Sequence, residues 1–339
     1  MATNRTMQTI LMRAPGGPEV LQLGEIPVPE LPSPSHLRVR LHAAGINPVD
    51  AKLRANGTYY PDRLPAVLGC DGAGVVEAAG SKVTRFRPGE AVYFFQGGIG
   101  GEAGNYAEYI TIHEDYAAAK PASLSFTEAA AVPLVLITAW EALNDRAQLK
   151  ASQSVLIHAG AGGVGHVALQ LARHLGARVA VTVSGAQKAS FAQALGAEQV
   201  INYKNDDFVQ ETLKWTGGDG VDVTFDTVGG ATFCRSFAAT RVYGHVVTIL
   251  QSDCEADALK IARLRNQSIS YELMLSPQYL GMHEARCAQR RILERGAALI
   301  DQGVLNIRVS HVLPLSQAAE AHHLIETGHT TGKIVLSIS

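Results

Sequence analysis

The chain has 339 residues, of which 47% are hydrophobic and 18% are charged. This composition supplies enough apolar side chains for a large core, and it excludes an intrinsically disordered chain. The formal net charge of −2, from 29 basic and 31 acidic residues, gives no electrostatic reason to expect nucleic acid or an anionic membrane surface as a partner.

Up to about residue 130 the sequence predicts short strands separated by turns. Pro27, Pro29, Pro32 and Pro34 mark a loop. Alternating or β-branched apolar residues then predict strands at 37–43, 73–79, 90–95 and 106–113. Because glycine- and proline-rich connections join these strands, we expect a mostly antiparallel β domain over residues 1–130.

From about residue 127 the pattern becomes helical and then alternates between strand and helix. An apolar segment at 154–157 leads into a glycine-rich turn and an amphipathic helix. Further strands are predicted at 178–183, 199–203, 221–226, 245–250 and 269–275, with helices at 187–195 and 206–215. Alternation at this pace is typical of βαβ units. Residues 131–280 are therefore predicted to form an α/β domain with a doubly wound parallel sheet.

The C-terminal part of the chain predicts a return to the first domain. A long helix is predicted at 284–302, and the remaining residues are predicted to return to short strands, the last at 332–336. We expect residues 281–339 to pack back onto the N-terminal β domain and to complete it.

The glycine-rich turn is the most informative motif of the chain. It has the sequence Gly160-Ala161-Gly162-Gly163-Val164-Gly165, between a predicted strand and a predicted helix. Glycines at this spacing allow a tight turn, let the backbone approach a pyrophosphate and let the helix pack close to the strand. The new helix also presents free N–H groups to the phosphates. The motif therefore predicts dinucleotide binding, against the alternative of a ligand-free βα turn.

The end of the second strand of this domain favours NADPH over NADH. NAD-binding folds usually place Asp or Glu there to bind the ribose 2′-OH. Here residues 184–188 contain Ser184 and Lys188 and no carboxylate. A hydroxyl and an ammonium suit a 2′-phosphate, and Tyr203 at the end of the next strand is expected to flank the phosphate or the adenine. The alternative for Lys188 is a solvated side chain on a helix.

Hydropathy and cysteine spacing predict the cellular setting. Residues 1–13 lack the pattern of a secretory signal, and no segment approaches the roughly 20 apolar residues that a membrane helix needs. The four cysteines form no C-x-x-C pair, so a structural thiolate zinc site is not expected. Cys234, Cys254 and Cys287 show no partner pattern and are interpreted as inert side chains. A cytoplasmic, reducing location is expected.

Six short segments spread over nearly the whole chain carry a family resemblance: 44–52 (AGINPVDAK), 68–76 (LGCDGAGVV), 87–93 (RPGEAVY), 159–165 (AGAGGVG), 197–203 (AEQVINY) and 331–336 (TGKIVL). They resemble the medium-chain dehydrogenase/reductase superfamily, and within it the zinc-independent quinone oxidoreductases (the ζ-crystallin-like group) and the related alkenal/enone reductases. The resemblance implies a GroES-like catalytic domain, with the Rossmann domain inserted, a cleft between them, and a homodimer or homotetramer.

The chain departs from the zinc alcohol dehydrogenases of this superfamily at their metal ligands. Those relatives are expected to have Cys where Asn47 stands, Gly-His-Glu where residues 69–71 are Gly-Cys-Asp, and a further Cys near Leu134. Asn and Leu do not replace two thiolates, and a catalytic Zn²⁺ needs three protein ligands. We therefore expect no metal and no alcohol oxidation, because zinc is the Lewis acid that generates the alkoxide.

Candidate catalytic residues follow from the resemblance. Asn47 is implied to lie near the nicotinamide ribose or the substrate, Lys52 to stabilise an enolate or hydroquinone oxygen, and Tyr59 to donate its hydroxyl or stack on a ring. The alternatives are surface positions for Lys52 and Tyr59 and a turn role for Asn47. Further positions expected to contact the cofactor are Thr138, Thr227 and Leu250.

Together these patterns predict an NADPH-dependent, metal-free reductase of a small-molecule quinone. The first alternative is NADPH-dependent C=C reduction of α,β-unsaturated aldehydes or ketones. An alternative of another class is a non-enzymatic crystallin-like or RNA-binding protein, against which the low aromatic content of 6% and the near-neutral charge argue.

Overall fold

The computed structural model describes residues 5–251 and 253–338. Two units with separate sheets make up the chain: unit 1 (Met1–Leu134 and Leu275–Ser339) and unit 2 (Val135–Met274). The boundaries fall a few residues from the predicted domain limits, since residues 131–134 and 275–280 lie in unit 1. Among the described residues, no helix is both long enough and apolar enough to span a bilayer.

Unit 2 contains a six-stranded sheet in the order β10-β9-β8-β11-β12-β13, and every neighbouring pair is parallel. This order confirms the predicted doubly wound sheet. Successive strands are added on one side of β8 up to β10 and then on the other side from β11 onward, so the order of the strands switches sides between β8 and β11. The strands are β8 (Ser154–Ile157), β9 (Arg178–Val183), β10 (Gln199–Asn202), β11 (Val221–Asp226), β12 (Thr240–Thr248) and β13 (Ser268–Tyr271).

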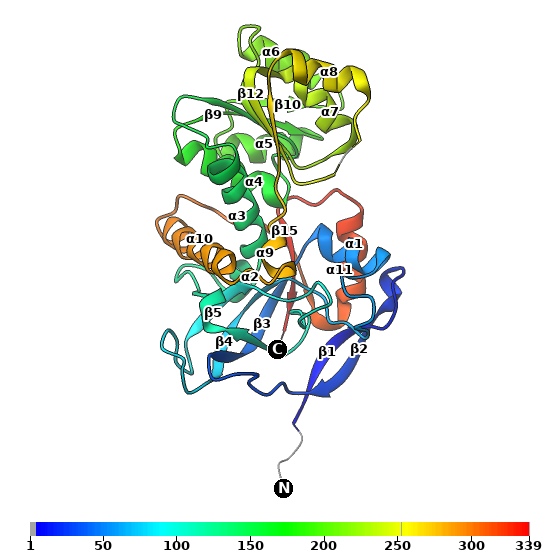
Figure 1. The fold of residues 1–339 in the computed structure, drawn as a ribbon, viewed down its shortest axis with the longest axis vertical. Helices are drawn as coiled ribbons and strands as arrows, with labels where there is room; N and C mark the ends of the chain where they lie inside the picture. Colours follow the sequence, from blue (N-terminus) through cyan, green and yellow to red (C-terminus); the bar gives the residue numbers. More distant parts are fainter. Residues whose placement is uncertain (1–4, 252, 339) are drawn as a thin grey trace. The chain divides into compact units, whose positions relative to one another are not determined.

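Helices connect these parallel strands, and α6, α7 and α8 pack side by side (Figure 1). One core cluster contains Leu156 of β8, Ala180 of β9 and Phe208 of α6. The central strands β8 and β9 are buried along nearly their whole length, as expected for parallel strands that helices cover on both faces. The helices are α4 (Gly163–His174), α5 (Ala186–Ala194), α6 (Phe208–Trp215), α7 (Gly230–Ala239) and α8 (Ala256–Leu264); α3 (Pro133–Trp140) and the π-helical turn η3 (Glu141–Arg146) precede β8.

Unit 1 contains a seven-stranded sheet in the order β14-β15-β3-β4-β5-β7, with β6 also paired to β3. All pairs except β14–β15 are antiparallel. β15 pairs with β3, which confirms that the tail completes the N-terminal sheet. The strands are β3 (His36–Ile46), β4 (Asp71–Ala79), β5 (Ala91–Phe95), β6 (Tyr109–His113), β7 (Ala117–Ala119), β14 (Val309–Pro314) and β15 (Lys333–Ser337).

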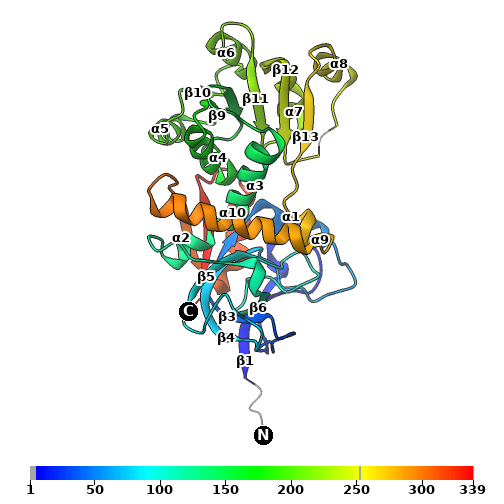
Figure 2. The same ribbon diagram turned by 60° about the vertical axis from the view of Figure 1, so that its left-hand side comes forward.

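The remaining elements of unit 1 surround this sheet. Strands β1 (Thr6–Met12) and β2 (Leu21–Pro27) form an antiparallel hairpin. Helix α10 (His283–Asp301) is the long orange helix of Figure 2, and it packs against β7 and η2 (Glu114–Tyr116). The other elements are η1 (Pro18–Val20), α1 (Pro48–Asn56), α2 (Phe126–Ala130), α9 (Ser276–Tyr279), η4 (Leu315–Gln317) and α11 (Ala318–Glu326).

Candidate functional site

The N-terminus of α4 presents backbone N–H groups that no side chain caps. Gly162 is the N-cap of α4, with φ −78° and ψ −179°, and no side chain caps the helix. The first N–H groups of a helix have no partner within the helix and attract anions. Gly163, Val164 and Gly165 supply these groups here. At the predicted pyrophosphate site, backbone N–H groups are therefore the donors that a phosphate would meet at the start of α4.

The glycines of this turn differ in what surrounds them. A Cβ on Gly160 would lie 2.5 Å from the Val181 Cβ, and a Cβ on Gly165 would lie 2.2 Å from the Ala159 carbonyl oxygen. A Cβ on Gly162 would meet nothing closer than 3.2 Å. Gly160 and Gly165 thus allow the close packing of strand and helix, while Gly162 faces the more open side where a ligand's phosphate needs room.

The carboxyl ends of β9 and β10 bring two ammonium groups together. Ser184 and Lys188 follow β9, and Tyr203 is an exposed side chain that follows β10. The pKa of Lys188 is lowered, first by burial and second by the charge of Lys204. Gly185, the N-cap of α5, adds a second helix start without a side-chain cap. This group of donors fits a phosphate, which would relieve the repulsion between the two lysines.

Lys204 is a residue that the sequence analysis missed. Its signal was present, because it directly follows Tyr203 at the end of the third strand of the sheet. Parallel neighbours β9 and β10 pair Val183 with Asn202, so the residues after both strands reach the same edge of the sheet.

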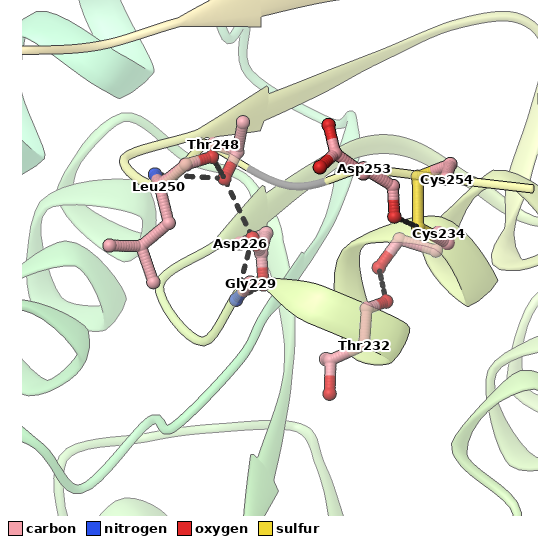
Figure 3. Close-up of a disulfide and its surroundings, with 9 residues drawn as sticks. Asp226, Gly229, Thr232, Cys234, Thr248, Leu250, Asp253 and Cys254 are labelled. Carbon is pink, nitrogen blue, oxygen red and sulfur yellow. Dashed lines mark hydrogen bonds between the residues drawn. A yellow bond between two sulfur atoms is a disulfide. The ribbon is translucent and has the colours of Figure 1, made fainter.

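The carboxyl ends of β11 and β12 are joined by a buried carboxylate. Asp226 accepts hydrogen bonds from the Gly229 N–H at 3.0 Å and the Thr248 hydroxyl at 2.7 Å (Figure 3). The Leu250 N–H donates to the same Thr248 oxygen at 3.1 Å. Thr227 donates from its hydroxyl to the His158 carbonyl at 2.8 Å. These bonds hold the loops that follow β11 and β12. Thr227 and Leu250, the predicted cofactor contacts, lie in these two loops.

Cys234 and Cys254 form a disulfide, so their interpretation as unpaired, inert side chains was wrong. Cys234 lies on α7, and Cys254 lies between β12 and α8, six residues after Thr248 (Figure 3). The two cysteines are 20 residues apart, and only the approach of α7 to the end of β12 brings them together. No C-x-x-C spacing marks such a pair.

The remaining cofactor candidate, Thr138, is buried in α3. His158, which flanks the glycine turn, is fully buried between the Thr182 and Ser236 hydroxyls, at 3.1 and 3.0 Å. Burial lowers the pKa of His158 to about 4. The residue therefore packs as a neutral imidazole.

In unit 1, Asn47 belongs to a buried polar cluster with Asp71 and Lys333. Its Nδ2 donates to Asp71 Oδ2 at 2.9 Å, and its Oδ1 accepts from Lys333 Nζ. Lys333 Nζ also lies 3.3 Å from Asp71 Oδ2, and the Leu134 N–H donates to Asp71 Oδ1 at 2.8 Å. Asn47 is also the N-cap residue of α1, and its backbone N–H donates to the Asp50 carboxylate at 2.8 Å. The structure thus gives both ends of the Asn47 amide a protein partner.

Burial controls the ionisation of this cluster. It raises the pKa of Asp50 to about 6, against the hydrogen bond from the Asn47 N–H. It also raises the pKa of Asp71, although the Lys333 charge and the Asn47 amide act in the opposite direction. The pKa of the Cys70 thiol is raised well above its usual value by burial and by both carboxylates. Cys70 therefore stays a protonated thiol.

This donor set does not suit a zinc ion. Asn47 offers an amide, the Cys70 thiol resists ionisation, and the Lys333 ammonium already provides a positive charge beside Asp71. A dication next to that ammonium would be repelled, and Zn²⁺ prefers thiolate and imidazole ligands. Lys333 belongs to the TGKIVL segment but had not been singled out as a site residue.

The other two candidate catalytic residues lie outside the buried cluster. Lys52 is exposed on α1. Tyr59 is 42% exposed and packs against Tyr279, with ring centroids 5.0 Å apart and planes tilted by 45°. The Tyr60 hydroxyl donates to the Tyr279 carbonyl at 3.4 Å. The structure therefore pairs the loop after α1 with α9, a contact that the sequence did not reveal.

Both units match known protein families. Residues 33–122 match the family model of the alcohol dehydrogenase GroES-like domain, and residues 195–336 match the model of the zinc-binding dehydrogenases. Quinone oxidoreductase 1 of Escherichia coli is 35% identical over 323 residues, which cover 95% of this chain and 96% of that protein. The 2-haloacrylate reductase of a Burkholderia species is 32% identical over 329 residues, which cover 95% and 96%.

Solved structures agree with these relatives. The crystal structure of the Escherichia coli quinone oxidoreductase complexed with NADPH gives a TM-score of 0.85 at 33% identity, covering 98% of this chain and all of that one. The GroES-like and Rossmann expectations are thereby confirmed. The chain belongs to the medium-chain dehydrogenase/reductase superfamily and, within it, to the group of the quinone oxidoreductases.

Proposed function

We propose that this chain is an NADPH-dependent oxidoreductase that reduces a quinone by metal-free hydride transfer. The observation that carries the proposal is the pair of ammonium groups, Lys188 and Lys204, beyond an uncapped glycine turn that suits a pyrophosphate. The relative of this family solved with NADPH supports the same cofactor.

Each part of the cofactor has residues that fit it. The N–H groups of Gly163, Val164 and Gly165 would hold the pyrophosphate. Gly160 allows the turn, and Gly162, whose own N–H donates to the Ala159 carbonyl at 2.8 Å, leaves room for the phosphates. Ser184, Lys188, Lys204 and Tyr203 would bind the 2′-phosphate and the adenine edge. Asn47 remains a proposed contact of the nicotinamide ribose, Thr227 and Leu250 are proposed to line the nicotinamide side, and Thr138 is proposed to lie near the cofactor phosphates. The cofactor supplies the hydride when bound, and the protein supplies position and charge.

The acceptor side of the proposal uses Tyr59 and Tyr279. Both rings are partly exposed, at 42% and 47%, and Leu280 and Met282 beside them are exposed apolar side chains. A planar quinone can stack on such rings, and Lys52 or the Tyr59 hydroxyl would stabilise the oxygen that gains charge. Reduction of one quinone to a hydroquinone takes one hydride and one proton, so one NADPH is oxidised for each acceptor.

The similarity to 2-haloacrylate reductase favours a second candidate, C=C reduction of an α,β-unsaturated carboxylate, aldehyde or ketone. There, too, charge moves to a carbonyl oxygen during hydride delivery. The same residues would serve both reactions, and the shape of the acceptor would select between them.

Steady-state turnover distinguishes these candidates. NADPH and NADH are each offered with a simple quinone, an α,β-unsaturated aldehyde, an acrylate and ethanol. We expect a quinone to give the highest kcat/KM with NADPH, and we expect chelators to leave that rate unchanged. Ethanol oxidation lost on chelation would contradict the metal-free proposal. Binding of single-stranded RNA in a mobility-shift assay, without turnover of any acceptor, would instead favour the non-enzymatic alternative.

We also propose a cytoplasmic enzyme that assembles as a homodimer or homotetramer, in which the Cys234–Cys254 disulfide would be an exception to the usual reduced state of cytosolic thiols. β13 is an edge strand of the unit 2 sheet, and Ile269 and Tyr271 on it are exposed. An exposed apolar edge strand is a natural place for pairing with a second copy. Light scattering of the purified chain tests this, with Ile269→Lys expected to reduce the molar mass to that of one chain.

A further inference from the structure

Three metal-binding side chains meet on unit 1 where η2 contacts α10. Asp115 lies in η2, and His283 and Cys287 lie on α10. His283 and Cys287 are four residues apart, so they share one face of the helix. The three ligand atoms lie within 4.8 Å of one another. None of these residues belongs to the proposed cofactor or acceptor sites.

Two of the three separations within this cluster fit tetrahedral coordination, and the third, between the Cys287 and Asp115 ligand atoms, is within 4.8 Å. His283 Nε2 lies 3.6 Å from Cys287 Sγ and 3.6 Å from Asp115 Oδ2. Zinc bonds of roughly 2.0–2.3 Å at tetrahedral angles separate neighbouring ligand atoms by about 3.3–3.6 Å. A zinc ion therefore fits between the three atoms with only small side-chain movements.

The cluster is not arranged as a nucleophilic relay. In a Cys-His-Asp relay the thiol and the carboxylate contact opposite nitrogens of the imidazole. Here both approach Nε2, while Nδ1 lies 2.9 Å from the Tyr116 hydroxyl. If the phenol oxygen accepts the Nδ1 hydrogen, Nε2 keeps its lone pair directed at the thiol and the carboxylate. An outer hydrogen bond of this kind is what orients a metal-binding histidine.

We propose that Asp115, His283 and Cys287 bind a divalent transition-metal ion of the zinc type. The combination of thiol, imidazole and carboxylate favours Zn²⁺ or Co²⁺ over Mg²⁺ and Ca²⁺, which prefer oxygen ligands only. Cys287 is 6% exposed and the His283 side chain 49%, so the site opens to solvent on the histidine side. A water molecule can complete the coordination. The metal would link η2 to the first two turns of α10.

Cobalt titration tests this site independently of enzymatic activity. The full-length protein is treated with EDTA, freed of chelator and titrated with Co²⁺, and a thiolate-to-cobalt charge-transfer band in the near ultraviolet is recorded. We expect saturation at one Co²⁺ per chain, with displacement of the band by Zn²⁺. Absence of the band in the parent protein would overturn the proposal.

Matched variants assign the ligands. Cys287→Ser is expected to abolish the band, and His283→Gln and Asp115→Asn to weaken Co²⁺ binding at least tenfold. Tyr116→Phe, which removes only the partner of Nδ1, is expected to weaken it by 10–100-fold. His311→Gln, an exposed histidine on β14, serves as the control. A band that persists in Cys287→Ser, or equal affinity in the parent, His283→Gln and His311→Gln, would exclude this site; circular dichroism verifies that each variant is folded.

Discussion

Lys333 places its ammonium nitrogen 3.3 Å from the Asp71 carboxylate in the buried interior of unit 1. Lys333 is the first residue of β15 and Asp71 the first residue of β4, and β3 lies between the two strands. The ion pair therefore connects the C-terminal tail to the N-terminal sheet. It also provides the positive charge that Asp71 would otherwise lack.

Lys333→Met is expected to destabilise unit 1 strongly. The change leaves Asp71 buried without a charged partner, and breaking a buried pair typically costs about 3–5 kcal/mol. Urea denaturation of the full chain, followed by circular dichroism, measures the loss; Trp140 and Trp215 both lie in unit 2, so their fluorescence serves as a separate probe of that unit. The double variant Asp71→Asn/Lys333→Met is expected to recover most of the stability. A double variant no more stable than Lys333→Met would show that the ammonium supports the fold by another route.

Asp50→Asn is expected to change the pH dependence of stability. The folded pKa of Asp50 is about 6, above the ordinary value of 3.8, because the side chain is buried. Its carboxyl therefore stabilises the fold most below pH 3.8, and that contribution is lost as the pH rises through 6. A pKa difference of about two between the folded and unfolded states corresponds to about 3 kcal/mol in the free energy of unfolding. The amide cannot ionise, and its oxygen can still accept from the Asn47 N–H and the Tyr106 hydroxyl.

The measurement for Asp50 is a difference between variant and parent. Burial lowers the pKa of His158 to about 4 and that of His322 to about 3, so these neutral histidines make the fold more stable as the pH rises to about 6.5. Subtraction removes their contribution from the comparison. The stability of Asp50→Asn relative to the parent should rise between pH 4 and pH 7. A constant difference over that range would contradict a raised Asp50 pKa.

Local sequence patterns predicted the central strands of the unit 2 sheet well. Strands β9 and β11 have the predicted bounds, because each is a short apolar run between turn residues. β12 begins at Thr240 instead of 245, because its first residues are polar or exposed and carry no apolar pattern. The β1–β2 hairpin was missed; Met12 pairs with Ala66 and Ile10 bonds to Tyr106, contacts that are distant in sequence.

In the candidate site, too, the residues of one continuous segment were predicted, and contacts between segments far apart in the sequence were not. The glycine turn, Ser184 and Lys188 are read from one stretch of chain, so sequence reasoning found them. Helix α1 also had a local signal, a capping box between Asn47 and Asp50 with Pro48 at its start, but the sequence analysis predicted no helix there. Lys333 meets Asp71 across 262 residues, and only the folded sheet reveals that contact.

Gly165→Ala is expected to disrupt the turn that carries the pyrophosphate site. The new Cβ would lie 2.2 Å from the Ala159 carbonyl oxygen, a backbone atom that cannot move without shifting β8 or α4. We expect a lower melting temperature and at least tenfold weaker binding of both NADPH and NADH. Gly185→Ala is the control for stability, because no atom lies within 4 Å of its Cβ position. Equal melting temperatures for the two variants would contradict the close approach at Gly165.

Charge reversal at Lys188 and Lys204 is expected to change coenzyme preference. Lys188→Glu and Lys204→Glu should each weaken NADPH binding about tenfold, or roughly 1.4 kcal/mol, because a carboxylate repels the 2′-phosphate. NADH lacks that phosphate and should be affected much less. Titration calorimetry with both coenzymes measures the ratio. Lys150→Glu, an exposed change before the opposite end of the sheet, is the control. Equal losses for NADPH and NADH in Lys188→Glu would refute its assigned role.

Reduction of the Cys234–Cys254 disulfide is expected to weaken both unit 2 and its hold on the cofactor. The bond closes a loop between residues 20 apart that contains β12 and Leu250, and loop closure of this length contributes roughly 3 kcal/mol in the chain-entropy model. Dithiothreitol and the Cys234→Ser/Cys254→Ser double variant should lower the melting temperature by similar amounts and weaken NADPH binding several-fold. Thiol titration should give two free groups, Cys70 and Cys287, in the unfolded oxidised chain and four after reduction. Four thiols without reductant would show that the two sulfurs are unbonded in solution, and an unchanged NADPH affinity on reduction would separate the bond from the cofactor site.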